Sequence, residues 1–234
     1  MSFLVNWDSV FENLGLTNGE TGVPHVYDYV PTSHMLITGG TGDGKTQLVA
    51  SMIMKFFNYN QVLILTAKPD ERIYQALRIM MEEDGVGEII HMYDDVEEFP
   101  KVLDLESSES IHRIVVFDDL VTLAGKDQKK IEDYFSMGRK ASCQCLYLTQ
   151  SFFKTPIFIR NQCKSFIFFL KTMTNKANVC YLRSAMFSDL TQKQFDALRR
   201  RLGAHDSVLV DVLSDHPKRY RINLGEEVDP NKLI

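Results

Sequence analysis

Short apolar runs alternate with helix-like segments along most of this chain, and this alternation limits the folds that are open to it. Six runs are nearly continuous in Val, Ile, Leu, Phe and Met: 34–38, 61–67, 88–93, 113–119, 145–150 and 165–170. Continuous apolar character is typical of strands that are buried on both faces. The intervening sequence predicts helices over 45–57, 70–83, 128–140 and 175–185. We therefore expect an α/β fold with a mostly parallel central sheet and helices on both faces.

The two ends of the chain depart from this alternation. After a last helix, expected over 191–203, residues 206–213 and 219–224 indicate a terminal pair of strands. The first residues are rich in Asn, Gly and Asp, which is typical of an extension that packs on a core rather than part of the sheet. The expected organisation is an N-terminal extension (1–33), one α/β domain (34–224) and a C-terminal tail (225–234).

Composition excludes several classes of protein. Hydrophobic residues make up 44% of the chain and charged residues 24%, which argues against disorder and fibrous repeats. The longest apolar run is strand-length, and the N-terminus lacks a basic leader, so we expect a soluble, intracellular protein with no membrane partner. Four cysteines without metal-site spacing are expected to be buried thiols. A net charge of −5 argues against a surface that binds nucleic acid all over, although a local basic patch is compatible with it.

The stretch ITGGTGDGKTQLV, residues 37–49, fits the phosphate-binding pattern G-x-x-x-x-G-K-[ST] between a predicted strand and a predicted helix. Glycines let successive backbone N–H groups point inward at phosphate oxygens, and the helix N-terminus favours negative charge. Lys45 is expected to reach the β- and γ-phosphates, and the Thr46 hydroxyl to ligate Mg²⁺. The expected nucleotide-binding residues are Gly39, Gly40, Thr41, Gly42, Asp43, Gly44, Lys45, Thr46 and Gln47.

Polar residues follow two of the other predicted strands. Asp118 and Asp119 end one of them, at the sheet edge where open α/β sheets bind ligands. Asp118 is expected to hold Mg²⁺, and Asp119 to accept a proton from the water that attacks the γ-phosphate. Gln150 ends the next strand and is expected to touch the γ-phosphate or orient that water. A helix cap or turn is the alternative for the acids, and a turn residue is the alternative for Gln150.

Three segments together resemble the FtsK/HerA superfamily of DNA-pumping ATPases: the glycine-rich loop, VVFDDL (115–120) and GRKASCQCLYLTQSFFKTPIFIRNQCKSFIFF (138–169). More narrowly, they look like the genome-packaging ATPases of large double-stranded DNA viruses, including the poxvirus type, and of virophages. The similarity runs from about residue 34 to residue 183, and its specific part is the basic GR before a strand that ends in TQS, followed by P..IR.N.

The resemblance implies a RecA/FtsK-like P-loop NTPase that depends on ATP and Mg²⁺ and works as a ring, a hexamer or a pentamer. Such a motor translocates double-stranded DNA into a preformed capsid, so a capsid or portal-vertex protein is an expected partner. The expected location is the virion or the host-cell cytoplasm, in a virus factory.

The resemblance also assigns roles to residues. Lys45 and Thr46 match the phosphate and metal positions, Asp118 the metal-holding acid and Gln150 the sensor glutamine. Asp119 departs from the common glutamate of the wider superfamily, although an Asp-Asp pair looks usual in the poxvirus-type branch. Ring ATPases of this kind usually insert an arginine from a neighbouring subunit. Our candidates for that arginine, each of which could equally be an ordinary surface or structural residue, are Arg139 and then Arg160.

Other functions share parts of these signals. Motors for plasmid or chromosome transfer have the same core, and the compactness of this chain favours packaging among them. TNKAN (174–178) approaches the guanine-reading N-K-x-D pattern of GTPase switches but ends in Asn178. A small-molecule phosphotransferase would need an arginine-rich lid, and none is evident between Asp119 and Gln150.

Candidates for DNA contacts are 199–201, 217–221 and the lysines Lys126, Lys129 and Lys130, with a solvated helix end as the alternative for 199–201.

Overall fold

The computed structural model describes residues 34–55, 59–83, 85, 87–106, 111–120 and 122–233. The expected N-terminal extension, 1–33, lies outside these residues. The strands are β1 (Met35–Thr38), β2 (Gln61–Thr66), β3 (Ile90–Tyr93), β4 (Arg113–Asp118), β5 (Cys143–Thr149), β6 (Ser165–Phe168), β7 (Val208–Asp211), β8 (Tyr220–Ile222) and β9 (Glu226–Glu227). The α-helices are α2 (Lys45–Lys55), α3 (Arg72–Glu83), α4 (Gly125–Met137), α5 (Ile157–Gln162), α6 (Lys176–Met186) and α7 (Gln192–Arg201).

One sheet, in the order β3-β2-β4-β5-β1-β6-β7-β8-β9, runs through the described part of the chain. The pairs among the first six strands of this order are parallel, and β7, β8 and β9 continue the sheet in antiparallel pairs. The register aligns Thr38 of β1 with Thr149 of β5, and Thr66 of β2 with Asp118 of β4. The carboxyl ends of these strands therefore meet at one edge of the sheet, as the predicted, mostly parallel arrangement requires.

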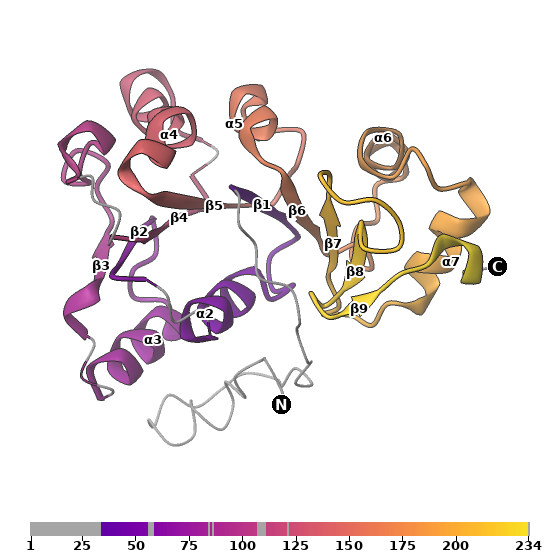
Figure 1. Ribbon diagram of the computed structural model, residues 1–234, viewed down its shortest axis with the longest axis horizontal. Coiled ribbons are helices and arrows are strands. Elements are labelled where there is room, and N and C mark those ends of the chain that lie inside the picture. Colours follow the sequence, from indigo (N-terminus) through magenta and orange to yellow (C-terminus); the bar gives the residue numbers. More distant parts are fainter. Residues whose placement is uncertain are drawn as a thin grey trace.

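Helices cover both faces of the sheet (Figure 1). Helices α2 and α3 lie on one face, and α4, α5 and α6 lie on the other. Alternate side chains of each strand serve the two layers: Val115 and Phe117 of β4 join the core that includes residues of α4, α6 and α7, whereas Ile114 and Val116 join the core of α2 and α3. Because both faces of the central strands are buried, their sequences are continuously apolar, which is the signal that predicted them.

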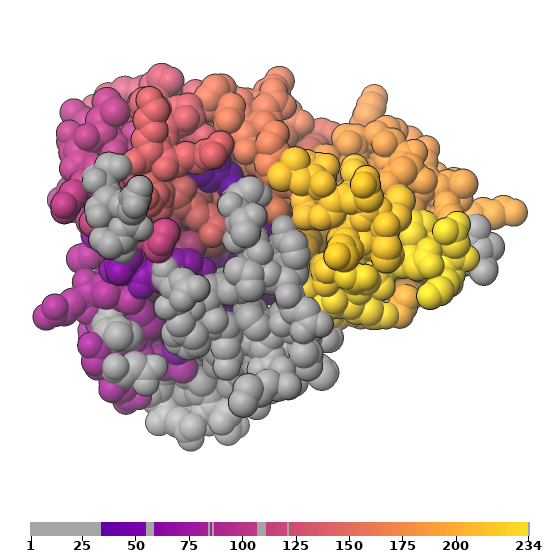
Figure 2. Space-filling view, in the orientation of Figure 1, coloured from indigo at the N-terminus to yellow at the C-terminus, as the bar shows by residue number. Residues whose placement is uncertain are grey.

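The elements after β6 gather at one end of the molecule (Figure 2). Helix α7 begins at a capping box in which the Thr191 side chain accepts from the Gln194 backbone N–H and the Gln194 side chain accepts in return from the Thr191 N–H. The predicted terminal pair of strands forms as β7 and β8, with Val208 opposite Ile222.

No helix among the described residues is both long and apolar enough to cross a membrane.

Several local expectations differ from the structure. Helix α5 was not expected because it has six residues and follows Pro156, so its sequence resembles a loop. The helix expected over 128–140 is α4 followed by a separate 3₁₀ turn, Gly138–Ala141, which ends at Ser142 in a left-handed conformation. Cys180 is exposed on α6, whereas the other three cysteines are buried as predicted. In the expected tail, β9 pairs with β8 through two exposed glutamates that carry no apolar signal.

An aromatic cluster ties β4 to the layer that contains α4. The Phe117 ring lies 5.6 Å from Phe99, 5.5 Å from Tyr134 and 5.9 Å from Phe135 between centroids. Phe117 is fully buried. Rings at these separations add favourable edge contacts to a large buried apolar area.

We expect Phe117→Ala to lower the free energy of unfolding by about 3–5 kcal/mol, because truncation of a buried ring leaves a cavity. Urea unfolding followed by circular dichroism measures the change. Leu103→Ala is the control, since that side chain is 76% exposed and its loss should cost less than about 0.5 kcal/mol. Similar losses for the two variants would contradict this account of the core.

Candidate nucleotide site

The glycine-rich loop leaves β1 at the carboxyl edge of the sheet and enters α2 at Lys45. Gly44 has φ +101°, a conformation that side chains other than glycine rarely adopt. Gly39 is required for a different reason: a Cβ there would lie 2.8 Å from the Phe169 ring and 2.9 Å from an Asp43 carboxylate oxygen. The loop can therefore take this path, with its backbone close to the protein, only with glycine at these positions.

Two side chains within the loop make internal contacts. Lys45 Nζ donates to the carbonyl oxygens of Gly39 at 2.9 Å and Gly40 at 2.8 Å, and burial lowers the pKa of this ammonium group. The Asp43 carboxylate is buried and accepts from the Thr172 hydroxyl at 2.7 Å and from the Gly40 N–H. Asp43, expected to bind nucleotide, thus uses its side chain to brace the loop against the segment after β6.

Asp118, the last residue of β4, is the point where three elements meet. Its Oδ2 atom accepts a hydrogen bond from the Thr46 hydroxyl of α2 at 3.3 Å and from the Tyr74 hydroxyl of α3 at 2.7 Å. Tyr74 is almost fully buried, and sequence reasoning missed it because it lies on a helix whose apolar face appeared purely structural. The contact places the two expected metal-holding residues, Thr46 and Asp118, side by side.

The environment of Asp118 fits a bound cation. The side chain is 5% exposed, and burial is the main cause that raises the pKa of its carboxyl group, while the bonds from Tyr74 and Thr46 lower it. A divalent cation would offset the cost of a desolvated carboxylate. No group of three or more His, Cys, Asp or Glu side chains suited to a metal occurs in the described residues, and Mg²⁺ typically needs only one or two carboxylates plus phosphate and water.

Asp119 and Gln150 lie together, as the adjacency of β4 and β5 predicts. Gln150 Nε2 donates to Asp119 Oδ2 at 2.8 Å. Asp119 has φ +57°, in the left-handed region that aspartate tolerates better than most residues, and its N–H donates to the Leu148 carbonyl at 3.1 Å. The backbone therefore turns sharply after Asp118, so that consecutive carboxylates have different partners.

These residues line one cavity of about 270 Å³. Its walls include loop residues, the ends of β2, β4 and β5, and the start of α3. Seven lining residues were not expected from the sequence, among them Lys68, Glu71 and His205. Lys68 and Glu71 follow β2, which neighbours β4, so the rule that ligands bind at the carboxyl ends of strands could have found them. Burial, followed by the charge of Asp118, raises the pKa of Glu71. The lining residues are Thr41, Gly42, Gly44, Lys45, Thr46, Gln47, Thr66, Ala67, Lys68, Glu71, Arg72, Ile73, Asp118, Asp119, Gln150 and His205.

The two candidate arginines lie outside this cavity. Arg139 is exposed in the turn that precedes β5, at the amino edge of the sheet. Burial, and then the Arg139 charge, lower the pKa of nearby His34 to about 4. Arg160 of α5 donates to the Thr155 carbonyl at 3.2 Å and lies 5.0 Å from the centre of the Phe152 ring. Neither arginine lines the cavity, so a catalytic role for each of them stays a prediction.

Most of the candidate DNA-binding cations have intramolecular partners. Arg199 donates to the Leu170 and Met173 carbonyls, which makes it a structural residue of α7. Arg201 pairs with Glu226, and Arg221 pairs with Glu227 at 2.8 Å. The lysines of α4 behave similarly, since Lys126 pairs with Glu97, Lys129 pairs with Asp133 and Lys130 donates to the Val96 carbonyl. Arg199 thus has a structural role, whereas the largely exposed ion pairs of Lys126 and Lys129 contribute little to stability, so DNA contact by these lysines stays a prediction.

The near-match to a guanine-reading motif has a structural role as well. Asn175 caps α6, with its side chain accepting from the Asn178 N–H at 3.1 Å. Neither residue is among those that line the cavity. The geometry therefore gives no support to a GTPase switch.

Fold and site together define a P-loop ATPase, and comparisons with known proteins agree with that class. The FtsK/SpoIIIE family model matches residues 5–83, about a third of the 234-residue chain, which include the glycine-rich loop, β2 and α3. This match supports the FtsK part of the resemblance seen in the sequence. No curated protein matches the chain.

Two of the solved structures with a similar fold come from Sulfolobus turreted icosahedral viruses. The genome packaging NTPase B204 of Sulfolobus turreted icosahedral virus 2, in complex with AMPPCP, has a TM-score of 0.58 and 13% identity, over 83% of this chain and 98% of that one. B204 of Sulfolobus turreted icosahedral virus, described as a DNA-packaging ATPase, has a TM-score of 0.57 and 12% identity, over 86% and 100%. These likenesses confirm the predicted FtsK-like α/β fold.

The Tyr74–Asp118 contact generates a prediction about metal binding. We expect Tyr74→Phe to weaken Mg²⁺ binding about 10–100-fold, because partners that orient a metal-holding carboxylate typically contribute that much. The hydrogen bond from Tyr74 lowers the pKa of Asp118, so its loss raises that pKa further. On acidification, the variant should therefore lose Mg²⁺ at a higher pH than the wild type does. Titration of Mn²⁺ in the presence of ADP, followed by electron paramagnetic resonance at several pH values, measures both effects.

Tyr134→Phe is the matched control. It removes the same atom from another fully buried tyrosine, whose hydroxyl donates to the Pro100 carbonyl at 2.9 Å in the other core. Equal metal affinities and equal pH profiles in the two variants would contradict a role for Tyr74 at the site.

Proposed function

We propose that this protein is an ATP-driven translocase of double-stranded DNA that packages a viral genome into a preformed capsid. In this proposal the motor is a ring of identical subunits, a hexamer or a pentamer, that docks on a capsid or portal-vertex protein in the virion or the virus factory. The observation that carries the proposal is the convergence of Lys45, Thr46, Asp118, Asp119 and Gln150 on one cavity. The FtsK/SpoIIIE match and the likeness to packaging NTPases support the choice of DNA as the substrate.

The division of the chain belongs to the same proposal. In it, the ATPase domain begins at residue 34 and 1–33 are an extension packed on it, while the expected tail, 225–234, contributes β9 to the sheet of that domain. The poxvirus and virophage types are the narrower groups that the three segments together resemble, and the Asp-Asp pair fits the poxvirus-type branch. Transfer of a plasmid or a chromosome is the alternative task for the same motor.

The roles of the residues follow from their positions. The loop N–H groups and Lys45 would bind the β- and γ-phosphates, and the Lys45 ammonium would leave the Gly39 and Gly40 carbonyls to do so. Thr46 and Asp118 would hold Mg²⁺, which neutralises charge that develops on the phosphate oxygens. Tyr74 would keep one Asp118 oxygen in place.

Hydrolysis transfers the γ-phosphoryl group to water. The water oxygen forms a bond to the γ-phosphorus as the bond to the β–γ bridging oxygen breaks, and ADP leaves. Asp119 would accept the proton that the water loses, and Gln150, hydrogen-bonded to Asp119 at 2.8 Å, would align the carboxylate and the water. An arginine from the next subunit would supply a positive charge that neutralises the charge developing on the γ-phosphate oxygens.

The primary test is ATP hydrolysis by the purified protein with and without long double-stranded DNA. We expect turnover that rises with DNA and prefers ATP to GTP, with Lys45→Ala at the level of the blank. Turnover indifferent to DNA would contradict a translocating motor while leaving the ATPase in place. A preference for GTP would contradict the packaging assignment.

Asp119→Asn tests the proposed base. We expect this variant to bind ATP as the wild type does but to turn it over about 10²–10⁴-fold more slowly, because the amide still fills the site and cannot accept the proton. Fluorescent-nucleotide binding and phosphate release measure the two effects. Asp104→Asn, on an exposed turn, is the control. Near-normal turnover in Asp119→Asn would show that Asp119 is not the base.

Arg139→Ala tests catalysis between subunits. We expect a large loss of turnover, poorly restored by Arg139→Lys because lysine lacks the planar fork of guanidinium. Rings mixed from Arg139→Ala and Lys45→Ala subunits should turn over ATP faster than rings of either variant alone. At some interfaces of a mixed ring, the intact cavity of an Arg139→Ala subunit faces the intact Arg139 of a Lys45→Ala subunit. Unchanged activity in Arg139→Ala, or no gain on mixing, would remove Arg139 as the trans-acting residue.

A further inference from the structure

His205 is the one lining residue of the cavity, among those described, that comes from the carboxyl-terminal part of the sheet. It lies in the turn between α7 and β7, about 160 residues after the glycine-rich loop beside which it lines the cavity. Its ring atom Nδ1 lies 3.4 Å from the carbonyl oxygen of Asp43. His205 is exposed, so its ring lies at the open side of the cavity that it lines and is not buried in the core.

The turn that carries His205 is closed by its own hydrogen bonds. The Asp206 carboxylate accepts from the Gly203 N–H at 2.7 Å and from Asn223 Nδ2 at 2.7 Å. The Asn223 side chain also accepts from the Ser207 N–H at 2.9 Å. These three polar contacts fix the turn on which His205 is carried before any ligand binds, which reduces the entropy that binding must offset.

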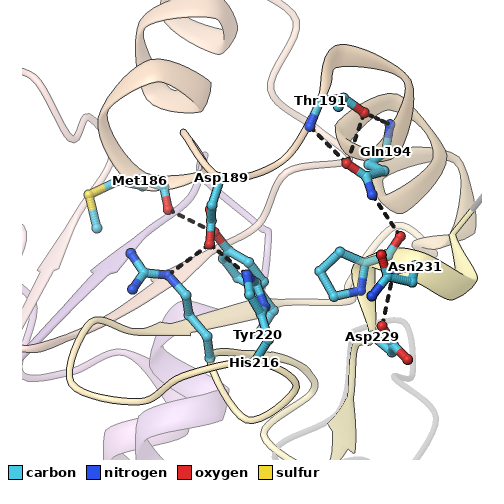
Figure 3. A network of polar contacts seen from close by, with 10 residues as sticks. Met186, Asp189, Thr191, Gln194, His216, Tyr220, Asp229 and Asn231 are labelled. Atoms are coloured by element: carbon cyan, nitrogen blue, oxygen red, sulfur yellow. Dashed lines mark hydrogen bonds and ion pairs between the residues drawn. The ribbon is translucent and has the colours of Figure 1, made fainter.

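The helix before this turn is anchored at both ends. Gln194, part of the capping box of α7, donates to the Pro230 carbonyl at 3.0 Å (Figure 3). Near the other end, Arg199 donates to the Met173 carbonyl at 2.8 Å. In the same figure, Asp189 accepts from His216 and Tyr220, which ties the segment before α7 to β8. The position of His205 is therefore set by the packed carboxyl-terminal layer rather than by a free loop.

The order of the strands places His205 on a particular side of the cavity. The sheet runs β4-β5-β1-β6-β7, so the loop after β1 lies between the catalytic groups on one side and β7 on the other. Asp118 ends β4, and Asp119 and Gln150 directly follow β4 and β5, on the side where the γ-phosphate and Mg²⁺ are proposed to bind. A nucleoside triphosphate carries its phosphates at one end and its nucleoside at the other. With the γ-phosphate toward β4, the nucleoside extends toward β7.

From this juxtaposition we infer that His205 contacts the nucleoside, the ribose and base, of the bound nucleotide and makes no contact with its phosphates. The inference rests on the proposed function, because it assumes that the cavity binds ATP. A flat imidazole ring at the mouth offers a face on which a base can stack and a ring nitrogen for a ribose hydroxyl. Nothing in the glycine-rich motif supplies such a contact, since the motif recognises phosphate through backbone N–H groups.

Binding of ADP and of inorganic tripolyphosphate to the full chain, measured by calorimetry with Mg²⁺ present, tests the inference. Tripolyphosphate reproduces the charged end of the ligand and lacks a nucleoside. We expect His205→Ala to weaken ADP binding about 10-fold, as loss of base stacking typically does, and to leave tripolyphosphate binding unchanged. His205→Phe, which keeps a flat ring, should recover most of the ADP affinity.

His112→Ala is the matched control, because His112 is an exposed histidine immediately before β4, at the opposite edge of the sheet. Equal ADP affinity in His205→Ala and the wild type would overturn the inference, and so would equal weakening of both ligands, which would place His205 at the phosphates. A wild-type protein that binds neither ligand would instead contradict the proposed nucleotide site. Unfolding temperatures of the variants confirm that each is folded.

Discussion

The interaction on which the rest of the site depends is the hydrogen bonding of a single buried oxygen, Asp118 Oδ2. It joins β4 to α2 through Thr46 and to α3 through Tyr74. A carboxylate that is 5% exposed is costly unless it is hydrogen-bonded, so these two hydroxyls are a condition of burying it. The same burial raises the pKa of Asp118 and prepares the site for a cation. Folding of the α2–α3 layer and assembly of the proposed metal site are therefore coupled.

The site is built from two kinds of structure with different origins. One wall comes from the parallel strands, whose aligned carboxyl ends bring Asp118, Asp119 and Gln150 beside the glycine-rich loop. The other wall comes from the antiparallel end of the sheet, through the turn that holds His205. We infer that the first wall serves the phosphates and the second serves the nucleoside. Many basic side chains of the antiparallel end, such as Arg201 and Arg221, are used in ion pairs that hold this layer together.

Sequence reasoning was most successful where a signal is local. The continuous apolar runs predicted the parallel strands because burial on both faces leaves no polar positions. The glycine-rich loop was visible because its conformations demand glycine at fixed places, as the φ of +101° at Gly44 illustrates. Sequence reasoning failed for helix α5, which is short and follows Pro156, and for β9, whose two glutamates carry no apolar signal. It also failed for the partners of Arg199, which lie 26 to 29 residues away along the chain.

The sequence by itself determined the α/β class of this protein, the order of its main strands and helices along the chain, and the residue types that a phosphate site needs. Only the tertiary structure decided which of these residues share one cavity. Strand order in the sheet differs from order in the chain, so Lys68 and Glu71 after β2 come beside Asp118, while Arg139 lies at the opposite edge. Likewise, Tyr74 and His205 acquire a role only through contacts across elements, because a hydrogen bond to Asp118 or a place against Asp43 leaves no pattern in the local sequence.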